Sequence, residues 1–165
     1  MIMGPGYEDF HYFQKLSDFE VPKRTTLDFP GVCDKLEKVK YETCGSAALS
    51  VLTSLNPGHI ERQLPGNRVH WTDASIIKFL HKRGFKTLQL TKRGITSLPG
   101  HFYPIMPISD RHVLLVNSLV CHNEASYFVI YKGFRYHNFE ATKLDPLFLI
   151  NKPPQNVFLV HNPKW

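Results

Sequence analysis

The hydrophobic periodicity of the chain changes at Gly84, and this change constrains the fold more than any other feature. Before Gly84, apolar residues recur at helical spacings, as in Ile76, Ile77, Phe79 and Leu80. After Gly84, short apolar and alternating runs are typical of strands. Helices followed by strands indicate an α+β fold, in which a helix packs on a largely antiparallel sheet.

Three helices are expected before the change of period. Thr43 is a suitable N-cap for a central helix with an apolar face, and Pro57 can open a second, short helix. Thr72 or Asp73 can cap the third helix, for which Gly84 stands at the C′ position. The apolar face of the central helix consists of Ala47, Ala48, Val51, Leu52 and Leu55.

Six strands are expected after Gly84, and a tight hairpin turn at Lys132-Gly133 joins two of them. The expected strands are 86–90, 102–108, 112–120, 127–131, 134–139 and 157–160.

The length of 165 residues fits one domain. Residues 1–30 lack sustained periodicity and are expected to form an N-terminal arm, with one short helix near 8–16. The arm either lies over the domain or is a partner-binding or autoinhibitory tail. Residues 31–165 are expected to form the domain itself.

Composition favours a cytoplasmic protein without a cofactor. The three cysteines form no CxxC pair, which argues against a disulfide framework and a cysteine-rich zinc site. No signal peptide and no run of 18 apolar residues is visible, so no membrane association is expected. The net charge of +6 favours acidic partners. The basic residues are scattered along the chain, and no nucleic-acid-binding motif accompanies them, so specific nucleic-acid binding is not expected.

Cys44 is the first candidate for chemistry, because it follows the expected cap Thr43 in the first turn of the central helix. Free N–H groups and the helix dipole favour a thiolate there, which makes the sulfur nucleophilic. Gly45 would let a substrate carbonyl approach the backbone beside the sulfur. The alternative is that Cys44 is a small buried hydrophobic residue.

His112 is the candidate base, because it opens the apolar strand that begins at Val113. Asn138, on a later strand, is the candidate third group that would orient the imidazole ring; the alternative is an asparagine with local backbone bonds. Other possible third groups are Asp110, Asn117 and Asp145, and other possible bases are His101, His122 and His137.

The helix-opening run Cys44-Gly45-Ser46-Ala47-Ala48, the strand-leading His112 and the later Asn138 together resemble the papain-like cysteine peptidases. The chain is most similar to small bacterial and phage members related to the peptidase domains that cut bacteriocin leaders. The resemblance covers about residues 30–160 and implies a papain-like fold and hydrolysis through a thioester. Such peptidases usually place an oxyanion-donating glutamine six residues before the nucleophile, and here that position is Lys38. Lys38, Lys40 or the backbone N–H of Cys44 would then be the donor.

The expected function is therefore that of a cysteine peptidase or amide hydrolase with a protein or peptide substrate. Deamidation and acyl transfer pass through a similar thioester, and a phage or bacterial effector would suit a small basic hydrolase. The main alternative is a noncatalytic binding module of the same fold that grips a protein or an acidic partner, with Lys38 in its favour. A nucleic-acid-associated protein is the third alternative.

Overall fold

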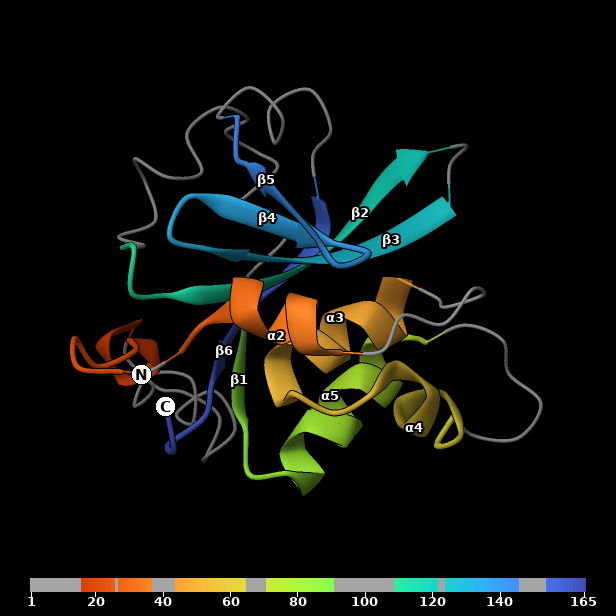
Figure 1. Cartoon of the computed structure of the whole chain (residues 1–165), viewed down its shortest axis with the longest axis horizontal. Coiled ribbons are helices and arrows are strands. Elements are labelled where there is room, and N and C mark those ends of the chain that lie inside the picture. Colours follow the sequence, from red (N-terminus) through yellow and green to blue (C-terminus); the bar gives the residue numbers. More distant parts are fainter. Residues whose placement is uncertain are drawn as a thin grey trace, which may run out of the picture.

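A computed structural model describes most of the chain. The described residues are 16–25, 27–36, 44–64, 71–90, 109–121, 124–145 and 154–165. They form an antiparallel sheet with the α-helices gathered on one of its faces (Figure 1), so the predicted α+β class is confirmed. The predicted helix near 8–16 and the predicted strand 102–108 lie outside this part, except for Leu16.

The sheet has six strands in the order β1-β6-β2-β3-β4-β5, and every neighbouring pair is antiparallel. The strand β6, last in sequence, lies between β1 and β2 and thereby joins the helical half of the chain to the hairpins. The strands are β1 (Lys86–Leu90), β2 (Val113–Cys121), β3 (Glu124–Tyr131), β4 (Phe134–His137), β5 (Glu140–Lys143) and β6 (Pro154–His161).

The predicted hairpin at Lys132-Gly133 is confirmed. Both residues have positive φ, 51° and 80°, as the central residues of a type I′ turn require. A second turn with two positive φ values, Asn138 at 49° and Phe139 at 67°, leads from β4 into β5. The strand β5 was not predicted, because its Glu-Ala-Thr-Lys sequence is exposed throughout and carries no apolar alternation.

The three predicted helices are present, and α3 packs against β3 and β4. Thr72 caps α5 through a capping box, in which its hydroxyl accepts the Ser75 N–H at 3.2 Å. Gly84 follows α5 with a φ of +83°, the left-handed conformation expected at C′. The helical elements are η1 (Leu16–Phe19), α2 (Phe29–Lys35), α3 (Cys44–Thr53), α4 (Pro57–Glu61) and α5 (Asp73–Lys82).

Both faces of the central strands are buried. In β2, Val113 and Leu115 pack with the helices, whereas Leu114 and Val116 join a second cluster on the opposite face, where Phe19 of η1 also lies. This two-sided burial explains why the sequence of β2 begins as a continuous apolar run rather than an alternating one.

The described part of the predicted arm belongs to this core. Val21 is fully buried and donates its N–H to the Arg111 carbonyl at 2.7 Å, and Glu20 forms an isolated β-bridge with His112. The carboxylate of Glu20 also pairs with the Arg111 guanidinium at 2.8 Å. Residues 16–25 therefore pack as part of the domain.

The helix α2 was not predicted, although its start carries a recognisable signal. Asp28 caps it by accepting the Gly31 N–H at 3.1 Å, and Pro30 follows in the first turn. None of the helices in the described ranges has the length and apolar character needed to cross a membrane.

Phe29 should be the most costly residue of α2 to remove. Its ring is 1% exposed and makes edge-to-face contacts with Tyr131, Tyr136 and Trp165, at centroid distances of 5.4, 5.5 and 6.2 Å. We expect Phe29→Ala to lower the free energy of unfolding by about 3–5 kcal/mol in urea titrations, because it leaves a cavity between helix and sheet. The control Phe134→Ala removes a ring that is 42% exposed and should cost much less; equal costs would mean that α2 does not stabilise the fold.

Candidate functional site around Cys44

Cys44 lies where the first turn of α3 meets the sheet. It is the first residue of α3 and is partly buried. Its Sγ accepts the backbone N–H of Tyr127 on β3 at 3.3 Å. The predicted position of the cysteine at the start of a buried helix is therefore confirmed, and its sulfur contacts the strand beneath.

A carboxylate with three hydrogen-bond donors occupies the same region. Asp73, the first residue of α5, accepts the Tyr127 hydroxyl at 2.6 Å and the Asn117 amide at 2.9 Å on Oδ1. Its Oδ2 accepts the Asn156 amide at 2.5 Å. These three donors face one another across β6, β2 and β3, because Asn117 is in register with both Tyr127 and Asn156. We refer to the four residues as the Asp73 cluster.

The cluster fixes the protonation of Tyr127. Burial, followed by the hydrogen bond and charge of Asp73 and the charge of Cys44, raises the pKa of Tyr127 far above its ordinary value. The phenol acts as a donor to Asp73, and its raised pKa keeps it protonated even well above neutral pH. Asn117 is 6% exposed, and its Oδ1 accepts no hydrogen bond from the described residues, so the cluster holds one unpaired buried acceptor.

The absence of a side chain at Gly45 has a packing reason. A Cβ there would lie 2.8 Å from Cβ and 2.9 Å from Cδ1 of Trp71, closer than such atoms approach. The indole of Trp71 is itself anchored, because its N–H donates to the Ser46 hydroxyl at 2.8 Å. In this structure the space beside Gly45, predicted to admit a substrate carbonyl, is filled by Trp71.

His112 leads its strand as predicted, but its ring is engaged away from Cys44. The side chain is 2% exposed. Its Nδ1 accepts the Ser109 N–H at 2.9 Å, so the ring carries its proton on Nε2 and donates it to the Leu16 carbonyl at 2.8 Å. Both ring nitrogens therefore link the backbone of η1 to the turn that precedes β2.

The sheet register separates His112 from Cys44. The sulfur of Cys44 is held by Tyr127, which pairs with Asn117, whereas His112 precedes the other end of β2. Positions 112 and 117 on one extended strand are about 16 Å apart at about 3.3 Å per residue. The structure thus does not bring the predicted nucleophile and base together.

Asn138 lies in the turn between β4 and β5, where its side chain is exposed and its φ is positive. Asparagine tolerates this conformation better than most residues, which accounts for its presence there. Its side chain makes no hydrogen bond to another described residue, His112 included. Lys38, the predicted oxyanion donor, lies outside the described residues.

Of the alternative third groups, Asn117 is the one that the structure brings next to Tyr127 and the start of α3. Asp110 and Asp145 are both exposed, one before β2 and the other after β5. Of the alternative bases, His137 contacts Ser126 at 2.9 Å and the ring of Phe128 on the face opposite the helices. Burial, with the nearby Arg135, lowers the pKa of His137. His101 and His122 lie outside the described residues.

Three members of the Asp73 cluster were not predicted as site residues. Asp73 was expected only to cap a helix, and Tyr127 and Asn156 only to lie in or near strands. The signal was the inward position of the two asparagines, because Asn117 continues the helix-facing series of Val113 and Leu115. Polar residues at such positions indicate a buried polar partner.

Comparison with known proteins assigns no family to the chain, because it matches no protein-family model and no curated protein. Within the described ranges, no three side chains of His, Cys, Asp or Glu lie together as a metal site would require.

Asp73→Ala should destabilise the fold more than loss of an exposed carboxylate. The change leaves the Tyr127 hydroxyl and the Asn117 amide without their acceptor, for a loss of about 2–4 kcal/mol in chemical denaturation. Asp34→Ala, on the exposed side of α2, is the matched control and should change stability by about 0.5 kcal/mol or less. An Asp73→Ala protein as stable as the control would mean that water replaces the carboxylate and that the cluster does not join α5 to the sheet.

Proposed function

We propose that this chain is a noncatalytic binding protein with a papain-like arrangement of helix and sheet, in which Cys44, Gly45 and His112 serve the fold. The observation that carries the proposal is the environment of His112. Its ring is buried and both its nitrogens bond to the backbone. A general base must come within hydrogen-bond reach of the group that it deprotonates.

Using His112 as the base would cost free energy, because its present bonds would have to break. The ring would have to break its bonds to Leu16 and Ser109 and leave a buried position. Residue 117, which pairs with the residue that contacts Cys44, lies about 16 Å further along the chain. Each of the two backbone groups left behind would lose its partner, at about 1–3 kcal/mol where it remained buried. A structural role accounts for the same observations without any movement.

An acidic partner suits the remaining features of the chain. The net charge of +6 favours encounters with anionic ligands or acidic protein surfaces. The proposal includes a reducing, cytoplasmic setting, which suits the lack of a disulfide bond at Cys33 and Cys44.

A thiol hydrolase that uses Cys44 is the second candidate, favoured by the surroundings of the sulfur. Cys44 opens the ten-residue helix α3, and its Sγ already accepts the Tyr127 N–H. Such an enzyme would need a histidine other than His112, or a different proton acceptor, beside the sulfur. It would form a thioester on Cys44 and release it with water.

The rate at which Cys44 reacts with iodoacetamide distinguishes the two functions. For a binding protein, labelling of Cys44 followed by mass spectrometry should be slow below pH 7, because such a protein needs no reactive thiolate. The buried Cys33, 3% exposed, serves as the internal control for global opening. Fast labelling of Cys44 below pH 7, with Cys33 unlabelled, would overturn the binding proposal in favour of the hydrolase.

His112→Ala tests the structural role directly. It removes the partner of the Leu16 carbonyl and of the Ser109 N–H, and should lower the free energy of unfolding by about 2–3 kcal/mol in urea titrations. His59→Ala, at an exposed position of α4, should have little effect. If His112→Ala is as stable as the wild type, the structural role is contradicted. That result would fit a catalytic base instead, because active-site residues often lower the stability of the fold.

A further inference from the structure

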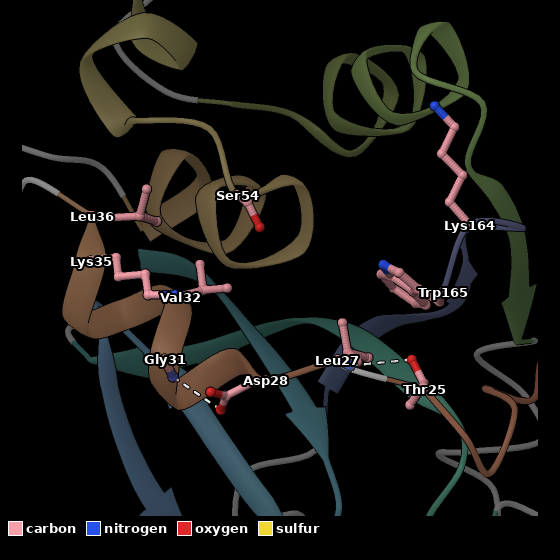
Figure 2. Close-up of a pocket in the computed structure, with 10 residues that line it drawn as sticks. All are labelled: Thr25, Leu27, Asp28, Gly31, Val32, Lys35, Leu36, Ser54, Lys164 and Trp165. Atoms are coloured by element: carbon pink, nitrogen blue, oxygen red, sulfur yellow. Dashed lines mark hydrogen bonds between the residues drawn. The ribbon is translucent and has the colours of Figure 1, made fainter.

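A pocket lies at the opposite end of α3 from Cys44. It is bounded by α2, by Ser54 directly after α3, and by the C-terminal residues Lys164 and Trp165 (Figure 2). Its volume of about 420 Å³ falls in the range of small-molecule sites. Cys44 and the Asp73 cluster do not line it, so the pocket is independent of the thiol chemistry discussed above.

Most polar side chains around the pocket carry groups that can donate hydrogen bonds. Lys35 and Lys164 line it from two different elements, and neither makes an ion pair within the described part of the chain. The Ser54 hydroxyl and the Trp165 indole N–H likewise bond to none of the described residues. The carboxylate of Asp28 caps α2 through the Gly31 N–H (Figure 2) and is the one negatively charged side chain among the described lining residues. A ligand rich in acceptors, with negative charge, matches this lining.

The rest of the lining is apolar and includes one rigid aromatic ring. Trp165 is held by edge-to-face contacts with Phe29, Phe85 and His161, at centroid distances of 6.2, 5.6 and 6.1 Å. Its indole shares the lining with Val32 and Leu36 of α2. A fixed indole beside aliphatic side chains favours a flat, apolar ligand body.

Ser54 directly follows α3, and its N–H donates to the Ser50 carbonyl at 2.8 Å. Its φ of 63° is unusual for a serine and costs about 1–2 kcal/mol relative to an ordinary conformation. A left-handed residue directly after a helix is a common way for the helix to end, so this conformation belongs to the end of α3.

We propose that this pocket binds a small planar aromatic compound that carries a phosphate monoester, such as a nucleoside monophosphate. The ring lies against Trp165 and the aliphatic side chains of α2. Lys35 and Lys164 lie on opposite sides of the pocket (Figure 2), and their long, exposed side chains turn toward the phosphate when it binds. The two ammonium groups outweigh the single carboxylate of Asp28, so the lining has a net positive charge that favours a phosphate of charge close to −2 at neutral pH. This inference rests on the proposed binding function and names its ligand class.

Isothermal titration calorimetry with four probes tests the ligand class. AMP and phenyl phosphate carry both a ring and a phosphate, whereas adenosine lacks the phosphate and inorganic phosphate lacks the ring. We expect the protein to bind at least one of the first two about tenfold more tightly than either of the last two, because only they engage both parts of the pocket.

Three lysine variants test the location. Lys35→Ala and Lys164→Ala should each weaken binding of the aryl phosphate about tenfold, as loss of one charge-assisted contact predicts. Lys143→Ala, on the exposed strand β5, removes the same charge outside the pocket and should leave the affinity unchanged. All three side chains are exposed, so none of these variants should unfold the protein.

Several results would overturn the inference. They are no binding of either aryl phosphate, equal affinity for inorganic phosphate or adenosine, or equal weakening by Lys143→Ala. These results leave the binding function itself standing if Cys44 labels slowly below pH 7. Fast labelling of Cys44 below pH 7 would instead overturn the function, whatever the calorimetry shows.

Discussion

The carboxylate of Asp73 joins the helical layer to the middle of the sheet. It begins α5 and accepts hydrogen bonds from β2, β3 and β6, which are neighbours in the sheet. The partners are in register, so each depends on the strand pairing that places the other two. Because Tyr127 also donates its backbone N–H to Cys44, the start of α3 is tied to the same point. Strand register, helix packing and the position of the cysteine are therefore linked through one acidic residue.

Local signals predicted much of the fold. The predicted and observed bounds of β1 agree at both ends of the strand. Helix ends also lie as expected at Pro57, Thr72 and Gly84. Each of these signals operates within a few residues, so the neighbouring sequence contains all the physics that it needs. The strand β5 was not predicted, because its side chains are exposed and do not alternate in polarity.

Local signals do not determine the distance between Cys44 and His112. One residue correctly heads a helix and the other correctly leads a strand, yet both descriptions are local. Their separation depends on which residue of β3 faces which residue of β2, and on where α3 crosses that pair. A shift of a few residues in register would change the distance by several ångströms without altering either local pattern. Sequence spacing alone therefore could not decide whether the two side chains meet.

Inward-facing polar residues offered a better guide to the site than the order of cysteine and histidine. Asn117 interrupts an apolar, helix-facing series, and burying an amide there is costly unless another element supplies a partner. That requirement constrains tertiary structure, because the partner must come from the helices that cover the sheet. Asp73 meets it from the first turn of α5, where a carboxylate is also favoured by the helix dipole. A buried polar side chain thus carries long-range information that helix and strand periodicity lack.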